Sequence, residues 1–492
     1  LVYHEYVHIL HLDTATEEAP FLNNFIGKQW NPNQVLPRWY IEGIAVMHES
    51  QRTGTGRLES ALFQMWLRTA ALEQSFFELG TVTGSPVEWP MGSTPYLYGG
   101  FFMQYVTDKH GGDVVPRFNE IYGSRILPFS LNSTAETVSG QTFHELWQEW
   151  ATVEKARAIA KRTAVEAAGR TRLDYMTEGG GEKRYPRFRN GTDTVTYSSV
   201  PFTSHPSIAE LGDNGVGQRT SRLLVADGLA GAHDWSPDGQ TVFFGRRTVD
   251  DNVYSYNELF AHSPRTDQTR QITEDERARE PAISHDGRRI AYVRNVLGSM
   301  ELVVRDIDTT APEAADVLLG ARDFPADDER HWQQISMPVF TPDDRGLVFS
   351  WWRLDRRVRD LWMYRFDAPE GERLVQLTDD AAHDLEPSFG PDGLLYFSSD
   401  RTGIYNVYAM NVTTGQTWQV SNVVNGVFSP RVSEDGEWVY VSSYTDQGYE
   451  IARFEYPDEL EPASSSYAST RREYPDIETD SWDDGSYQAW RW

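Results

Sequence analysis

Two histidines, His4 and His8, and two glutamates, Glu5 and Glu42, are the side chains of this chain that could hold and use a metal ion. Residues four positions apart lie on one face of an α-helix, so the two histidines can point at the same ion. Glu5 is one position beyond His4 and can instead reach a water bound at that ion. Glu42 lies in an apolar segment, residues 39–47, where a carboxylate needs a partner because burying a lone charge is costly. We therefore predict a catalytic zinc site with two histidine ligands, Glu42 as the third ligand and Glu5 as the general base.

Two further residues leave alternatives open. His11 would lie on the same helical face as the other two histidines. There it is either the third ligand in place of Glu42, a residue that contacts a ligand without binding the metal, or a packed residue of the core. Glu49 follows Glu42 by two helical turns, and it either orients a metal-bound histidine through the free ring nitrogen or is a solvated acidic residue. An HExxH motif also arises in helices that bind no metal, where both histidines are ordinary polar residues.

The motif at residues 4–8, followed by Trp39-x-x-Glu42-Gly43-x-Ala45, resembles the gluzincin zinc metallopeptidases, in particular the bacterial peptidase MA-like group. The resemblance covers about the first 150 residues. It implies a Zn²⁺-dependent endopeptidase or aminopeptidase-like hydrolase. A Tyr-Gly-Gly stretch within residues 96–102 also matches that group, in which a downstream tyrosine or histidine stabilises the oxyanion. The resemblance implies Tyr98 for this role, with Tyr96 as the second choice and a packing tyrosine as the alternative.

The resemblance also implies a small β-sheet ahead of the first helix, whose edge strand holds the substrate peptide. Only three residues precede His4 in this chain. We therefore expect an N-terminally truncated gluzincin-like domain, and the activity of this truncated form is left open.

The elements that must position these residues are helical. Residues 1–165 are predicted to form the zinc metallopeptidase domain, with helices at 58–79, 101–110 and 143–168, where apolar residues recur at helical spacing. Glycines at 179–181 then break the pattern, and residues 166–184 are predicted to be a linker.

A repeat follows the linker, in which a turn containing Asp precedes a short apolar strand. Its Asp residues stand 48, 57, 49 and 43 positions apart, at Asp238, Asp286, Asp343, Asp392 and Asp435, and a weaker copy spans residues 188–197. This spacing is typical of propeller blades, and the Asp residues are interpreted as turn formers rather than ligands. The repeats resemble those of the TolB-type WD-like β-propeller. The predicted fold class is multidomain α + all-β, with a mainly helical gluzincin-like domain followed by a six-bladed propeller at 185–456.

Composition limits the class of protein further. A chain of 492 residues is too long for one core, and its net charge of −28 argues against nucleic acid or anionic membrane as a partner. The absence of cysteine excludes disulfides and thiolate metal sites. Residues 457–492 are acidic and are expected to be an extended or disordered tail.

Two functions are compatible with these patterns. The first is an exported zinc metallopeptidase, periplasmic or on the bacterial cell surface, whose propeller binds a protein or peptide. Its substrate would be a peptide or protein, an envelope protein would bind the propeller face, and a longer parent would associate with the outer membrane. The alternative is a cell-envelope propeller that serves as a binding or scaffold protein and carries a vestigial peptidase domain.

Overall fold

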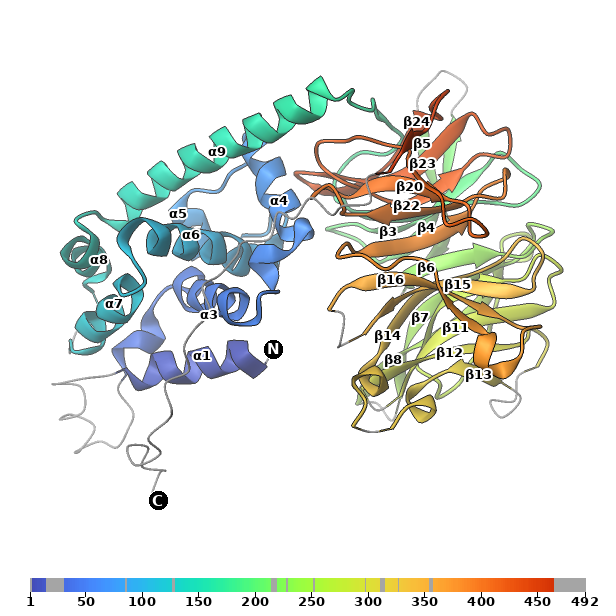
Figure 1. Cartoon of the computed structure of the whole chain (residues 1–492), viewed down its shortest axis with the longest axis horizontal. Helices are drawn as coiled ribbons and strands as arrows, with labels where there is room; N and C mark the ends of the chain where they lie inside the picture. The colour runs from blue at the N-terminus through green and yellow to red at the C-terminus, as the bar shows by residue number, and fades with distance from the viewer. Residues whose placement is uncertain are drawn as a thin grey trace.

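A helical part is followed by a many-stranded, propeller-like β region, and the two lie side by side (Figure 1). The computed structural model describes residues 2–14, 31–84, 86–125, 129–213, 219–226, 229–250, 253–296, 298–309, 315–325, 327–353 and 357–463. The predicted tail at 457–492 lies outside these residues from position 464 onward. Among the described helices, none is both long enough and apolar enough to cross a membrane.

The helical part has these helices: α1 (Val2–Asp13), α3 (Arg38–Thr53), α4 (Ala61–Leu72), α5 (Leu79–Thr83), α6 (Thr94–His110), α7 (Val114–Gly123), α8 (Leu131–Ser139) and α9 (Phe143–Ala167). The predicted helix at 58–79 is shorter, because after α4 the chain turns through Gln74, which has a left-handed φ of 62°. The helix predicted at 101–110 begins earlier, with Pro95 in its first turn. Helix α9 starts at a capping box between Thr142 and Glu145, as the signal for a helix start requires.

Helices α3 and α6 cross at unusually short range, and glycines make this approach feasible. A Cβ atom added to Gly99 of α6 would lie 2.1 Å from the carbonyl oxygen of Trp39. One added to Gly43 of α3 would lie 2.6 Å from the backbone of Gly99. The Tyr-Gly-Gly stretch therefore has a packing function, which brings the face of α6 that carries Tyr96 against the face of α3 that carries Glu42.

Aromatic side chains form the core around this crossing. Trp39 and Tyr40 of α3 are fully buried, and their rings contact Phe143 of α9. Helix α1 packs on α3 through Val7, so the HExxH motif is held against the segment that contains Glu42.

The β region begins with β1 (Asp174–Tyr175) and β2 (Gly181–Phe188), so residues 166–184 contain the end of α9, β1 and the start of β2. The first group of strands is β2 with β3 (Val195–Val200), β4 (Ser207–Asp213) and β5 (Arg219–Ala226). The second is β6 (Leu229–Trp235), β7 (Val242–Asp250), β8 (Tyr254–Ser263) and β9 (Gln268–Gln271). The next are β10 (Ala278–Ile283), β11 (Arg289–Val296), β12 (Ser299–Asp306) and β13 (Asp316–Leu319), then β14 (Gln334–Phe340), β15 (Gly346–Trp352), β16 (Arg359–Arg365) and β17 (Leu374–Gln376). The last are β18 (Asp384–Phe389), β19 (Leu395–Ser399), β20 (Asn406–Met410) and β21 (Thr417–Gln419), then β22 (Val427–Val432), β23 (Trp438–Thr445) and β24 (Gly448–Glu455). A short strand, β25 (Glu461–Pro462), pairs with β21.

Within each group, neighbouring strands pair antiparallel in chain order. Strands β6–β9, β10–β13 and β14–β17 are separate four-stranded sheets, and β18–β21 gains β25 at its edge. An eight-stranded sheet joins β22–β24 to β2–β5 through parallel pairing of β24 with β2, while β1 pairs with β24. The first strands of successive groups contact each other from β2 through β6, β10, β14 and β18 to β22, and β22 in turn contacts β2.

The repeated Asp residues lie in the turns that precede the second strand of each group. Asp238 accepts hydrogen bonds from the Ser236 hydroxyl at 2.5 Å and from the N–H of Gln240 at 3.0 Å. Asp286 accepts one from Ser284 at 2.6 Å in the corresponding turn. Their carboxylates are thus used within their own turns, which is the role predicted for them.

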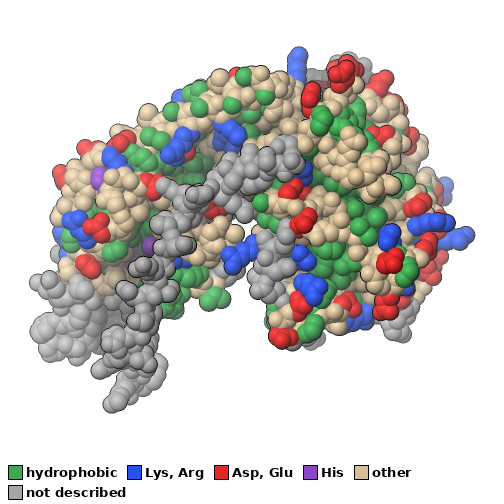
Figure 2. Space-filling model, viewed as in Figure 1, with side chains coloured by type: hydrophobic (Ala, Val, Ile, Leu, Met, Phe, Trp, Pro, Cys, Tyr) green, Lys and Arg blue, Asp and Glu red, His purple; other side chains and the backbone are tan. Residues whose placement is uncertain are grey.

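The helical part and the β region share a packed interface. Met65 of α4 joins Tyr405, Phe428 and Tyr444 of the β region in one apolar cluster. Arg68 of the same helix donates to the carbonyl oxygens at positions 424 and 425, at 3.0 and 2.8 Å. Figure 2 shows acidic side chains spread over both parts on the visible face, in keeping with the net charge of −28.

Candidate metal centre

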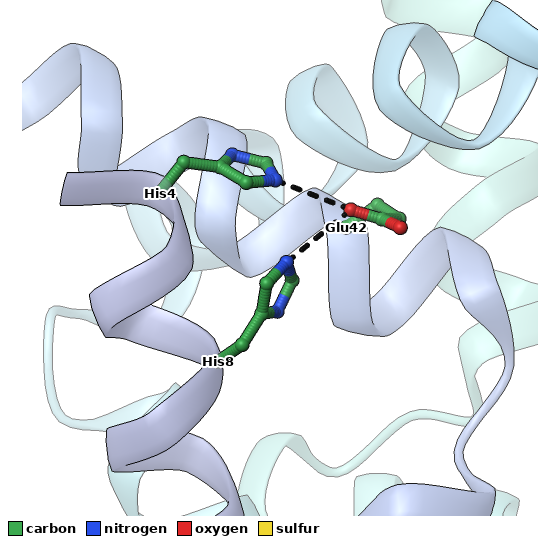
Figure 3. Close-up of side chains that lie close together, drawn as sticks. All are labelled: His4, His8 and Glu42. Carbon is green, nitrogen blue, oxygen red and sulfur yellow. Dashed lines mark hydrogen bonds and ion pairs between the residues drawn. The ribbon is translucent and has the colours of Figure 1, made fainter. Parts of the chain in front are cut away.

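His4 and His8 of α1 point toward Glu42 of α3 (Figure 3). Glu42 Oε2 lies 3.2 Å from His4 Nε2 and 3.4 Å from His8 Nε2. One ligand atom from each of the three side chains lies within 4.8 Å of the other two. Two helices thus bring together the three side chains that the sequence predicts as metal ligands.

Two of the three spacings between these atoms suit a small tetrahedral ion. Bonds of about 2.0–2.1 Å at tetrahedral angles place neighbouring ligand atoms about 3.3 Å apart. The two distances to the Glu42 oxygen lie close to this value. The donor set of two imidazoles and one carboxylate is that of catalytic zinc sites, so the residues present fit Zn²⁺.

Glu49 and Arg57 hold the far side of the His4 ring. Glu49 Oε2 lies 3.2 Å from His4 Nδ1, and the Arg57 guanidinium lies 3.5 Å from the same carboxylate. Hydrogen bonds to Glu42 and Glu49 raise the pKa of His4 to about 8. In the neutral ring, a proton on Nδ1 toward Glu49 would leave the Nε2 lone pair free for a metal ion held beside Glu42.

Tyr96 and Arg38 contact the other oxygen of Glu42. The Tyr96 hydroxyl donates to Glu42 Oε1 at 3.1 Å, and Arg38 lies 3.8 Å from the same atom. Burial would raise the pKa of Glu42, but hydrogen bonds with His4 and Tyr96 lower it below its usual range. The arrangement therefore favours an ionised Glu42, the form that binds a cation.

Tyr98, the first choice for oxyanion stabilisation, does not reach the site. Its ring is 1% exposed and stacks on Phe77 and Trp147 in the aromatic core. Its hydroxyl accepts a hydrogen bond from the N–H of Phe77 at 3.4 Å, and burial raises its pKa. Tyr98 has the packing role that was the alternative for it, whereas Tyr96, the second choice, lies at the site.

Glu5 and His11 lie outside the group of three. Glu5 follows His4 on α1, and its side chain is exposed. His11 is 3% exposed, and burial lowers its pKa to about 4. Its ring lies beside Tyr40 and lines a cavity of about 210 Å³ on another side of α1. His11 is therefore a buried, neutral histidine rather than a member of the ligand group.

Sequence reasoning missed two cations of the site, Arg38 and Arg57. Arg38 stands four positions before Glu42, a spacing that could have indicated the pair. Arg57 lies in a short turn of 3-10 helix between α3 and α4, and its position depends on tertiary packing. No sequence signal marks it.

The β region resembles a known family. Residues 268–470 match the family model described as TolB beta propeller domain. TolB from Acinetobacter baumannii is 15% identical, with 55% of this chain and 64% of that chain covered and a TM-score of 0.39. A putative TolB from Agrobacterium tumefaciens is 18% identical, with 48% and 80% covered and a TM-score of 0.39. No curated protein matches. Residues 268–470 are thus similar to the TolB beta propeller domain. The chain spans less than two thirds of the first of these two structures.

Proposed function

We propose that this chain is a zinc-dependent metallopeptidase whose ligands are His4, His8 and Glu42. The observation that carries the proposal is the position of one Glu42 oxygen, which faces an imidazole nitrogen of each histidine at 3.2 and 3.4 Å. Arg38 and Tyr96 contact one oxygen of the Glu42 carboxylate, and the two imidazoles face the other. The second oxygen and the two imidazole nitrogens together could bind a cation. The proposal includes hydrolysis of peptide bonds by the chemistry expected of a gluzincin-like enzyme.

Zinc bound there would supply a Lewis acid and lower the pKa of a coordinated water toward about 7. Glu5 would accept the proton of the attacking water and pass it to the leaving nitrogen of the peptide bond. Tyr96 would donate its hydroxyl proton in a hydrogen bond to the developing oxyanion, the role first expected of Tyr98. Glu49 would keep His4 in the tautomer that presents Nε2.

We further propose that the β region is a six-bladed propeller that binds a protein or peptide of the bacterial envelope. The cycle of contacts from β2 through the first strand of each group and back to β2 supports the six-bladed count. The net charge of −28 of the whole chain supports an exported protein, periplasmic or at the cell surface.

A second candidate is a binding or scaffold protein of the envelope with a vestigial peptidase domain. The exposed Glu5 side chain favours it, because it makes no hydrogen bond or ion pair within the described part of the chain. In that case the three ligands would still bind metal, but no peptide would be cleaved.

The test is zinc content, measured by mass spectrometry on the purified chain and its variants. About one zinc per chain is expected in the wild type, and its loss in His8→Ala and in Glu42→Ala. His144→Ala and Glu136→Ala are matched controls, because both side chains are exposed in the same helical part, and both should retain zinc. A zinc-free wild type, or zinc retained in both ligand variants, would contradict the proposed site.

Catalysis is tested separately with a library of fluorogenic peptides. Glu5→Gln keeps the zinc and is expected to lower kcat by about 10²–10⁴-fold, because general-base catalysis is lost. A zinc-loaded wild type that cleaves no peptide would favour the scaffold candidate.

A further inference from the structure

A cavity of about 320 Å³ lies where the helical part meets the β region. Its helical wall comes from α4, which faces the β region (Figure 1), and from α6 and α9, while Gly403 between β19 and β20 lines it from the β region. Its volume equals that of about ten water molecules at roughly 30 Å³ each, so it can hold a small ligand. The charged residues that line it are Arg68, Glu154, Arg157 and Lys161.

Arg68 of α4 and Lys161 of α9 line this cavity without a carboxylate partner. Arg68 donates through Nε and Nη2 to the carbonyl oxygens at positions 424 and 425, at 3.0 and 2.8 Å. Lys161 Nζ donates to the carbonyl oxygen of Thr402 at 3.2 Å, which uses one of its three N–H groups. Neither side chain forms an ion pair with any residue that the structure describes. Both therefore have donors left for a further ligand.

The carboxylate of Glu154, which lines the same cavity, is bound elsewhere. Its Oε1 accepts hydrogen bonds from Arg157 at 2.6 Å and from the Trp150 ring N–H at 3.1 Å. Burial raises the pKa of Glu154, although both partners oppose this shift. Since Arg157 balances this carboxylate, the charges of Arg68 and Lys161 stay uncompensated.

The two uncompensated cations also act on each other. Burial lowers the pKa of Arg68 to about 10. Burial lowers the pKa of Lys161 as well, and the Arg68 charge lowers it further. Each charge thus makes the other less favourable. An anion held beside both side chains would remove this penalty, because it attracts the two cations that now repel.

We propose that Arg68 and Lys161 bind the oxyanion of a small molecule, a phosphate or carboxylate group, in the cavity between the helical part and the β region. Partly buried charges without partners are destabilising, so such a pair favours an anion. The guanidinium fork matches two oxygens of a phosphate or carboxylate, and the ammonium adds further donors. Leu67 and Phe101 also line the cavity and offer an apolar wall to the rest of the ligand.

A ligand in this cavity would also stabilise the docking of the two parts. Both cations already donate to carbonyl oxygens of the β region, and the anion would hold them in place. None of the proposed zinc ligands lines the cavity, so the site stands independently of the proposed peptidase function.

The probes are phenyl phosphate and benzoate, which share a ring and differ in the oxyanion. Each is titrated into the full chain by calorimetry at an ionic strength held constant with NaCl. Wild type is expected to bind at least one probe and to show a higher Tm in its presence. Binding of one probe alone assigns its group, and binding of both assigns a site for either oxyanion. Phenol, the same ring without an oxyanion, should bind more weakly than either bound probe.

Lys161→Gln is expected to raise the Kd by at least about tenfold, because a charge-assisted hydrogen bond is lost. It should also abolish the rise in Tm on adding the probe, whereas a purely structural lysine would lower the Tm and leave the Kd unchanged. Lys161→Arg keeps the charge and should bind the probe. Lys155→Gln is the matched control at an exposed lysine of the same helix outside the cavity, and its Kd should equal that of the wild type.

His8→Ala separates this site from the proposed metal centre, because it removes a zinc ligand and should leave the Kd for the probe unchanged. If Lys161→Gln does not fold, Arg68→Lys, which keeps a charge and loses the fork, should weaken binding in its place. The site is overturned if neither oxyanion binds, if phenol binds as tightly, if the Kd of the folded Lys161 or Arg68 variant is unchanged, or if His8→Ala abolishes binding.

Discussion

At the scale of single residues, Tyr96 is the side chain whose role the geometry defines most sharply. Its hydroxyl touches Glu42, its ring lies 6.0 Å from that of His4, and the Arg57 guanidinium lies over its face. Burial and the Glu42 charge raise its pKa, so Tyr96 keeps its proton and remains a donor at neutral pH.

Tyr96→Phe is therefore expected to lower kcat for peptide hydrolysis by about 10²–10³-fold, because one oxyanion donor is removed. KM and zinc content should change little. Tyr98→Phe is the matched control from two positions along the same helix, and its kcat should stay close to wild type. Equal losses of kcat in the two variants would contradict the assignment.

The sequence predicts the three side chains that the structure brings together, His4, His8 and Glu42, but not the choice between these two tyrosines. Both precede Gly99 and Gly100, so both fit the motif equally well. Positions two apart on a helix point about 200° away from each other, so only one can face α3 at the site. Which one does so depends on the rotation of α6 about its axis, which packing against α3 sets.

His233, in the β region, gives a test of stability against pH. It is fully buried, its ring nitrogens contact the Thr196 and Ser198 hydroxyls, and burial together with Arg187 and Arg431 lowers its pKa well below 6.5. The unfolded chain binds a proton at this residue below about pH 6.5, while the folded chain does not. Its contribution to stability is therefore present above pH 6.5 and is lost as pH falls toward the folded pKa.

His233→Gln should consequently reduce the loss of stability on acidification by about 1.4 kcal/mol per pH unit over that window. The measurement is urea unfolding at pH 7 and pH 5, monitored by fluorescence. His144→Gln, an exposed histidine, should retain the wild-type dependence on pH. A His233→Gln curve parallel to that of the wild type would refute the buried neutral state.

At the scale of elements, the crossing of α3 and α6 positions the site. Gly99→Ala would place a Cβ atom against the Trp39 backbone. Backbone atoms within a helix cannot move aside as the end of a flexible side chain can. We expect the variant to lose more than about 2 kcal/mol of stability, because overpacking must push the helices apart. Zinc affinity should also fall, since Glu42 and Tyr96 lie on these two helices.

Gly80→Ala is the control for Gly99→Ala, because a Cβ atom at Gly80 meets nothing within 4 Å. It should bind zinc like the wild type, and circular dichroism with calorimetric zinc titration would compare the two. If Gly99→Ala has the stability and zinc affinity of the wild type, the close crossing of α3 and α6 does not position the site.

The strands show a similar limit of sequence reasoning. Turns with Asp and the apolar strands after them follow from local chemistry, and they occur where predicted. The pairing register of β2, β10, β14, β18 and β22 shifts at a bulge in each strand. These bulges were not predicted, although a residue followed by Pro recurs at 185–186, 280–281, 337–338, 386–387 and 429–430. Proline cannot donate to a sheet ladder, so this recurrence was a signal for interrupted pairing.

At the scale of the whole molecule, the interface between the helical part and the β region joins residues far apart in sequence. Arg68 bonds to carbonyl oxygens at positions 424 and 425, and Trp89 donates to the Tyr444 hydroxyl at 2.8 Å. No local pattern predicts such pairs, because they depend on how the two completed parts dock.

Arg68→Met is expected to weaken this docking, because it removes two charge-assisted hydrogen bonds worth about 1.5–3 kcal/mol each before relaxation. Calorimetry should then resolve two unfolding transitions, or separate them further than in the wild type, since parts that no longer stabilise each other unfold independently. Arg117→Met, at a half-exposed arginine of α7, which lies at the end of the helical part away from the β region (Figure 1), should leave the calorimetric profile unchanged. Zinc content should also survive in Arg68→Met, because the ligands lie on α1 and α3 alone. If Arg68→Met leaves the separation of the transitions as in the wild type, the two parts are not coupled through this arginine.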